Sequence, residues 1–138
     1  AQNRAEDVEA YVSTTYGEAF QRREIENSNI ITLVVELDEA LVAFAQIRRT
    51  PHAPHGDVEI ARFYVDQSHH GRGIAQALME AVYAHARTLG CTRLWLGVWE
   101  RNFRAIAFYV KCGFEKVGQH PFVLGTDLQT DWDMARAL

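Results

Sequence analysis

The sequence has little cysteine and no long apolar run, and both absences narrow the class of protein. The chain of 138 residues holds two cysteines, Cys91 and Cys112, with no CxxC spacing. We interpret both as buried or half-buried thiols of a reducing compartment, not as a redox or metal centre. No stretch reaches the ~18–20 apolar residues that a membrane span needs, and no signal peptide is visible. We therefore expect a cytoplasmic protein without a membrane partner.

The chain also lacks an excess of positive charge. It has 14 basic and 18 acidic residues, which give a formal net charge of −4. This balance argues against general nucleic-acid binding and leaves room for a cationic partner. Apolar residues make up 48% of the chain, enough for a globular core, and the length fits one domain over residues 1–138.

The pattern of apolar and turn-forming residues predicts alternating strands and helices. Helices are expected at 5–27, at about 73–89, and from Asn102 to Gly113. Strands are expected at 29–37, 39–49, 58–65 and 92–99, and in two short segments, "FEKVGQHPFVL" and "TDWDMARAL". A tight turn at Asp38-Glu39 and a loop at 51–57 separate the early strands. This order predicts an α/β (α+β) fold, in which helices flank a mixed sheet.

A glycine-containing turn, "HHGRGIAQALM", joins a predicted strand to a predicted helix. The first amides of a helix lack internal partners and carry partial positive charge, and glycines let an anion approach them. Gln76 stands where a dinucleotide fingerprint needs its third glycine, and the P-loop pattern is absent. On these residues alone, a phosphate site and a plain strand–helix turn remain equally good interpretations.

Two segments together resemble the GNAT-type N-acetyltransferases. In "YVDQSHHGRGIAQALM", Gly73 and Ala75 fill the small-residue positions of the family's acetyl-coenzyme A turn, and His70 stands where the family usually has Arg or Gln. The second segment, "NFRAIAFYVKCGFEKVG", follows in the family's order. The tail, with "GVWE", "TDLQTD" and "DMA", resembles most the PaiA-type polyamine (spermidine/spermine) acetyltransferases. The family's opening strand has no counterpart here, so we expect that a longer chain precedes Ala1.

The resemblance implies a GNAT fold, with a mostly antiparallel mixed sheet and two central strands, 58–65 and 92–99, that splay apart. It implies acetyl-coenzyme A as cosubstrate, with the pyrophosphate on the turn and the pantetheine arm along the first splayed strand. No metal is expected. The residues expected to bind the cofactor are Phe63, Tyr64, Val65, His70, Gly71, Arg72, Gly73, Ile74, Ala75, Asn102 and Phe108.

Direct attack of an amine on a thioester needs a base, an oxyanion donor and an acid for the thiolate. The resemblance gives the acid role to Tyr109, which lies two helical turns after Asn102. The amide of Val65 is a candidate oxyanion donor. Glu59 is the candidate base, on a strand face that alternation predicts it to share with Ala61, Phe63 and Val65. A salt-bridged surface role for Glu59, and Glu100 or a water chain as the base, remain open.

Other residues have plainer interpretations. His52 and His55 are expected in a solvated loop and not in a metal site. Trp95 and Trp99 are expected in the core or a pocket wall. Three aspartates near the end of the chain are expected to be exposed, and some of them, with Glu100, would suit the rim of a polyamine site. They are Asp127, Asp131 and Asp133.

The function expected from the resemblance is transfer of an acetyl group from acetyl-coenzyme A to a primary amine of a small molecule, with a polyamine favoured. One alternative acceptor is a protein N-terminus, an amino acid or an aminoglycoside-like compound. Another alternative is a coenzyme A-binding module without catalysis. A homodimer is plausible from the resemblance alone, and neither nucleic acid nor a membrane is expected as partner.

Overall fold

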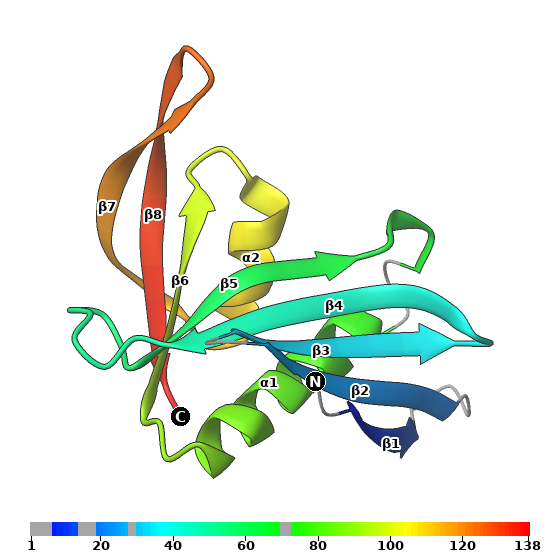
Figure 1. Ribbon diagram of the computed structural model, residues 1–138. Coiled ribbons are helices and arrows are strands. Elements are labelled where there is room, and N and C mark those ends of the chain that lie inside the picture. Colours follow the sequence, from blue (N-terminus) through cyan, green and yellow to red (C-terminus); the bar gives the residue numbers. More distant parts are fainter. Residues whose placement is uncertain (1–6, 14–18, 28–29, 70–72) are drawn as a thin grey trace.

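A single eight-stranded sheet carries both helices of the fold (Figure 1). The computed structural model describes residues 7–13, 19–27, 30–69 and 73–138. The strand order in the sheet is β1-β2-β3-β4-β5-β6-β8-β7. The strands are β1 (Asp7–Ser13), β2 (Ala19–Asn27), β3 (Ile30–Leu37), β4 (Ala40–Arg49), β5 (Val58–Val65), β6 (Arg93–Trp99), β7 (Glu115–Leu124) and β8 (Asp127–Ala137). The helices are α1 (Ile74–Thr88) and α2 (Phe103–Lys111), with a 3-10 turn at Gln67–His69.

All neighbouring strands are antiparallel except β5 and β6, which are parallel. This arrangement confirms the mixed, mostly antiparallel sheet with flanking helices. The predicted tight turn is also present, since Asp38 and Glu39 have φ values of 53° and 68°. The last two strands, expected to be short, have 10 and 11 residues. No helix in the described ranges is long and apolar enough to cross a membrane.

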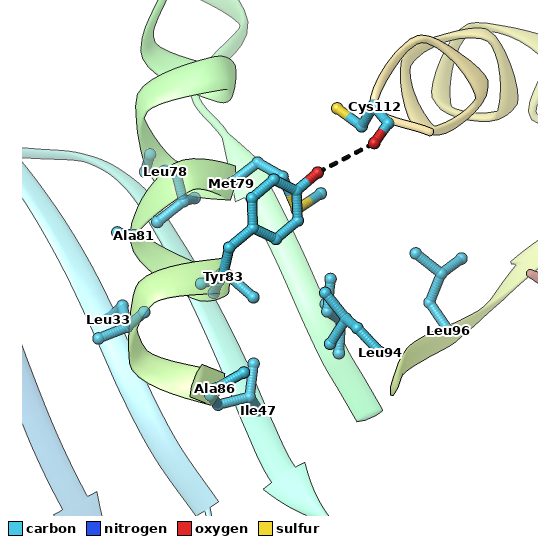
Figure 2. Packing of buried hydrophobic residues seen from close by; sticks show 14 of the residues in the cluster. Leu33, Ile47, Leu78, Met79, Ala81, Tyr83, Ala86, Leu94, Leu96 and Cys112 are labelled. Carbon is cyan, nitrogen blue, oxygen red and sulfur yellow. Dashed lines mark hydrogen bonds between the residues drawn. The ribbon is translucent and has the colours of Figure 1, made fainter. Parts of the chain in front are cut away.

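Both helices pack on the same face of the sheet, which we call the helix face. Buried apolar side chains of β3, β4, β5, β6 and β8 form one core with those of α1, and Figure 2 shows part of this core in close view. The hydroxyl of Tyr83 on α1 donates to the carbonyl oxygen of Cys112 after α2, at 3.2 Å, and so joins the two helices. Cys112 is buried and Cys91 half-buried, and both are free thiols, as predicted. Burial raises the pKa of both thiols.

The sheet parts between β5 and β6. The two strands pair only at Val58–Leu94, Glu59–Trp95 and Ile60–Leu96. Residues 61–65 and 97–99, all of them described, form no pairs with each other, and Figure 1 shows the two strands diverging toward α2. This confirms the splayed central strands. The gap leaves main-chain groups of an inner strand without a neighbouring strand, and such an edge suits an extended ligand.

A β-bulge lies in β5 at the start of the gap. Gln46 pairs with Arg62, whereas the next residue of β4, Ile47, pairs with Ile60. Ala61 is therefore an extra residue, and the alternation of side chains shifts by one there. Two odd-numbered residues of β5, one before and one after the bulge, therefore point to opposite faces of the sheet.

The prediction of a helix over residues 5–27 is wrong. The described parts of this segment form β1 and β2, and β2 pairs with β3 from Gln21–Glu36 to Asn27–Ile30. Within "DVEAYVS", two valines and a tyrosine suit a strand better than a helix. "AFQRREIEN" has ordinary helical propensity, so the long-range pairing to β3 decides its conformation.

Asp57 joins the starts of β5 and β6, at the end of the two strands where they still pair. Its carboxylate accepts hydrogen bonds from the amides of Thr92 and Arg93 at 2.9–3.1 Å. Partial desolvation opposes ionisation, but these hydrogen bonds prevail and lower the pKa of Asp57 below 3.8. The carboxylate therefore stabilises the fold above about pH 4, and its contribution disappears as the pH falls through the lowered pKa.

We expect Asp57→Ala to lower the free energy of unfolding by about 1–2 kcal/mol at pH 7, because several hydrogen bonds to a partly exposed charge are lost. Urea unfolding at pH 7 and pH 3 measures this loss, which shrinks at the lower pH. Asp127→Ala, on the exposed first residue of β8, is the control and leaves stability unchanged. A loss of equal size at both pH values would contradict the role of the charge.

Candidate functional site

A cavity of about 660 Å³ lies on the helix face beside the gap. Its walls come from the end of β5, the first turn of α1 and one side of α2. The lining residues from these elements are Phe63, Tyr64, Val65, Gln67, Gly73, Ala75, Gln76, Asn102, Arg104, Ala105, Phe108, Tyr109 and Lys111. The cavity thus brings together eight of the predicted site residues from segments that are distant in the sequence.

The N-terminus of α1 forms one end of the cavity. Gly73 is its N-cap, with φ 79°, a left-handed conformation that favours glycine. Within the described residues, no side chain caps this terminus, and the first turn has no acidic residue. At α2 the arrangement differs, because Oδ1 of Asn102 accepts a hydrogen bond from the amide of Ala105 at 3.2 Å. The amides of α1 are therefore the better site for an anion.

Tyr109 lies on α2 with its ring in an aromatic cluster. The rings of Phe63, Phe108 and Phe114 lie 5.7–6.2 Å from it, centroid to centroid. The residue is 8% exposed and also lines the cavity. Among the described residues its hydroxyl has no hydrogen-bond partner. Burial, and to a smaller extent the nearby Cys112, raise the pKa of Tyr109 to about 12, so the phenol keeps its proton at neutral pH.

Three predicted cofactor residues, His70, Gly71 and Arg72, lie outside the described residues. Ile74 is 1% exposed, with its side chain in the core, so only its backbone amide is left for a ligand. Asn102 caps α2 and also lines the cavity, and its hydrogen bond to the cofactor remains a prediction.

Glu59 lies apart from the cavity. Its Oε1 is 2.8 Å from Nε of Arg48, its partner across β4 and β5. Because of the bulge, the prediction that Glu59 shares a face with Phe63 and Val65 is wrong: Glu59 points to the face opposite the helices. We call this the second face, defined by Glu59, Trp95, Gly97, Asp131 and Asp133, which the strand register places on one side of the sheet.

Sequence reasoning missed four polar residues of the cavity wall, which are Gln67, Gln76, Arg104 and Lys111. Two of them add positive charge to the side that α2 contributes. Gln76 lies three residues after Gly73, and Arg104 and Lys111 lie four before and three after Phe108, so these three carried a signal, because residues three or four apart share a helix face. Gln67 lies outside both helices and carried none.

The second face holds a cluster that also departs from prediction. Asp133, expected to be exposed, is 6% exposed and is the one buried charged side chain among the residues whose burial is described. His120 and His55 both contact its carboxylate. Trp95 is half-buried and donates from Nε1 to Oγ1 of Thr50 at 2.9 Å. Trp99, expected in the core or a pocket wall, is 44% exposed.

Comparison with known sequences agrees with this geometry. The sequence profile of the acetyltransferase (GNAT) family matches residues 3–114. An uncharacterised N-acetyltransferase of Mycobacterium tuberculosis is 39% identical over 106 residues, which are 77% of this chain and 66% of that protein. The chain thus spans just under two thirds of that relative's length. A spermine/spermidine N(1)-acetyltransferase of Bacillus subtilis is 32% identical over 69 residues, 49% of this chain and 45% of that protein.

Solved structures share the fold. NAA60 of Arabidopsis thaliana, solved with a bisubstrate analogue, has a TM-score of 0.71 and 19% identity, over 80% of this chain and 76% of its own. The PaiA N-acetyltransferase of Thermoplasma acidophilum, solved with coenzyme A, has a TM-score of 0.64 and 21% identity, over 80% and 62%. The predicted closeness to PaiA-type enzymes is not confirmed, since these polyamine-related matches are partial or distant. The profile match over most of the chain shows that the chain belongs to the acetyltransferase (GNAT) family.

Proposed function

We propose that the chain is an acetyl-coenzyme A-dependent N-acetyltransferase that acetylates a primary amine of a small molecule, with a polyamine favoured. The observation that carries this proposal is the cavity at the gap between β5 and β6. It combines an uncapped helix N-terminus, which suits a pyrophosphate, with a protonated tyrosine in its wall.

The cosubstrate would lie along this cavity. The amides of Gly73, Ile74 and Ala75 hold the pyrophosphate, and His70, Gly71 and Arg72 remain predicted cofactor residues. Positive charge from α2 adds to this binding, because Arg104 and Lys111 line the same cavity. The pantetheine arm runs along residues 63–65 at the inner strand edge. Asn102 donates to it from its amide group, and Phe108 packs against it.

The chemistry proceeds in a ternary complex. A neutral amine attacks the thioester carbon, a C–N bond forms, and the C–S bond breaks. Tyr109 donates its proton to the departing thiolate and regains one from the acetylated nitrogen. The phenol is a weak acid at a pKa of about 12, but the same burial also raises the proton affinity of a thiolate in this cavity. The backbone amide of Val65 is proposed as oxyanion donor. Glu59, the base predicted from the sequence, is ion-paired with Arg48 and does not line the cavity.

The favoured acceptor rests on charge and partial similarity. Of the three carboxylates on the second face, Glu59 is paired with Arg48 and Asp133 with two histidines, so Asp131 and the net charge of −4 of the whole chain supply the attraction for a cation. A polyamine has several cationic centres that such a surface attracts. The similarity to the Bacillus subtilis enzyme supports the same class. We place the reaction in the cytoplasm, and the homodimer remains a prediction.

Release of coenzyme A from acetyl-coenzyme A tests this function directly. The panel contains spermidine, spermine, amino acids, aminoglycosides and N-terminal peptides, and calorimetry measures acetyl-coenzyme A binding in parallel. Turnover on polyamines supports the favoured acceptor. Turnover on peptides alone would keep the enzyme class and reject the polyamine. Binding without turnover on any amine would favour the non-catalytic binding module.

Gly73→Ala is expected to weaken acetyl-coenzyme A binding at least tenfold. A Cβ at φ 79° is strained, and the amides at the start of α1 shift to relieve that strain. Gly90→Ala is a matched control, because Gly90 has φ 80° and a Cβ there would meet no atom within 4 Å. We expect Gly90→Ala to cost similar stability and to leave the dissociation constant unchanged. Equal affinities for Gly73→Ala and the unmodified chain in calorimetry would reject the anion site.

A further inference from the structure

Asp133 is a buried carboxylate with two histidine partners on the second face. Its Oδ1 lies 2.9 Å from Nδ1 of His120 on β7, and its Oδ2 lies 3.4 Å from Nε2 of His55 in the loop before β5. A carboxylate this buried needs such partners, because an unpaired buried charge is costly. In the described part of the chain, no group of three or more potential ligands has a geometry that could hold a metal ion.

The carboxylate fixes the orientation and the tautomer of His120. An ionised carboxylate only accepts hydrogen bonds, so Nδ1 of His120 must carry the hydrogen that it donates to Oδ1. In the neutral ring, Nε2 then carries the lone pair. The His120 side chain is 44% exposed, so this nitrogen can take up a proton and return it to solvent. An oriented imidazole beside a buried carboxylate is a common arrangement for a general base.

The position of His120 places this base beside the gap. A Cβ built on Gly97 would lie 3.6 Å from Cε1 of His120 and 4.0 Å from Oδ2 of Asp131. Gly97 is the first residue of β6 after its last pair with β5, at Leu96. The imidazole and a second carboxylate therefore meet where the sheet opens, on the face opposite the cofactor cavity.

Gly118 leaves the space that His55 and Asp133 occupy. A Cβ at Gly118 would lie 3.3 Å from the His55 ring and 3.4 Å from Oδ2 of Asp133, closer than most side chains tolerate. The ring of Trp95 meets the ring of His55 edge to face, at 6.1 Å between centroids. His55 therefore contacts Oδ2 of Asp133, and His120 contacts Oδ1.

We propose that His120, oriented by Asp133, is the base that deprotonates the acceptor ammonium on the second face. This inference rests on the proposed acetyltransferase function and deepens it. The N–H bond of the ammonium breaks, its proton moves to Nε2 of His120, and the freed electron pair of the amine attacks the thioester. His120 then releases its proton to water. Asp133 and His55 are positioning residues, and Asp131 attracts the ammonium.

The test compares His120→Asn and Asp133→Asn with the unmodified chain over pH 6.5–10.5, using a primary alkylamine acceptor that the panel has identified. The titratable or charged groups that face His120 are Asp131 and Asp133 from β8 and His55 from the loop, whereas β6 presents Gly97 there. At pH 7 an alkylamine with a pKa of about 10.4 is almost wholly protonated. We expect kcat/KM of His120→Asn to fall about 100-fold there.

The diagnostic result is the recovery of the variant with pH. Near pH 10.5 half of the acceptor is already neutral, so the defect of His120→Asn should shrink to a fewfold. An α-amino acceptor with a pKa of about 8 should show a smaller defect at pH 7. Asp133→Asn should show a similar recovery, and calorimetry should give the same acetyl-coenzyme A affinity for all variants. His52→Asn, on an exposed histidine of the same loop, is the matched control with unchanged kinetics.

A defect of equal size at every pH would overturn the proposal, because a structural role has no link to the charge of the acceptor. Full activity of His120→Asn at pH 7 would also overturn it and leave the acetyltransferase function intact. Binding of acetyl-coenzyme A without turnover by the unmodified chain would reject both proposals together.

Discussion

Tyr109→Phe is expected to lower kcat about 100-fold and to leave acetyl-coenzyme A binding nearly unchanged. The substitution removes only the hydroxyl of a residue that lines the cavity, and it keeps the ring in its aromatic cluster. General acid catalysis is typically worth 10²–10⁴-fold. Steady-state coenzyme A release gives kcat, and calorimetry gives the affinity.

The control for this experiment is Tyr83→Phe. Tyr83 is also buried, its pKa is also raised to about 12, first by desolvation, and it does not line the cavity. We expect Tyr83→Phe to cost some stability, through its lost hydrogen bond to Cys112, without lowering kcat. If Tyr109→Phe keeps more than half of the original kcat, Tyr109 is not the acid.

The pH dependence of the acid has a definite sign. A proton donor is active in its protonated form, below its pKa. With a pKa of about 12, Tyr109 stays protonated through the neutral and mildly alkaline range. No loss of kcat below about pH 11 should therefore come from Tyr109.

Phe114→Ala is expected to lower the free energy of unfolding by about 3–5 kcal/mol, as large cavities in cores do. Phe114 is 2% exposed and is the largest of the fully buried side chains whose burial is described. For a chain of this size the midpoint of thermal unfolding should fall by roughly 10–20 °C. The ring of Phe114 also lies 5.7 Å from that of Tyr109, so kcat should fall with it.

Two further variants show whether this loss reflects packing. Phe114→Leu retains most of the volume and should cost about 1–2 kcal/mol. Phe103→Ala, on a 73% exposed residue at the start of α2, should cost less than about 0.5 kcal/mol. If the midpoint of thermal unfolding of Phe114→Ala lies within a few degrees of that of the unmodified chain, the aromatic cluster does not stabilise the packing of α2.

The sequence alone predicted the parts of the fold whose patterns are local. Alternation along residues 30–37 and 40–49, and the capped start of α2 at Asn102, all have counterparts in the structure. The splayed strands followed from the family resemblance and not from any local signal. The segment 5–27 was mistaken for a helix because the strands in its described parts depend on pairing, of β1 with β2 and of β2 with the more distant β3, which a short window of sequence does not contain.

The candidate site was predicted in part for a related reason. Eight residues of the cavity wall lie in or directly beside the two segments that resemble the family, so they were found together, whereas four polar residues of the same wall were missed. His120, His55 and Asp133 come from three separate elements, and their contact depends on the register of β7 and β8. The face of Glu59 was mistaken because one extra residue in β5 shifts the alternation, and a bulge leaves little trace in the sequence.

The divergence of β5 and β6 leaves a place in the sheet where a further strand could pair. The gap between β5 and β6 leaves inner main-chain groups to be paired by a bound molecule or by water. If the pantetheine arm takes that place as proposed, the free energy of ligand binding adds to the free energy of unfolding, because only the folded chain binds the ligand. At a concentration 100 times the dissociation constant, the ligand would add about 2.7 kcal/mol to the stability of the protein. The acetyl-coenzyme A supply of the cell would then govern the lifetime of the protein as well as its rate of turnover.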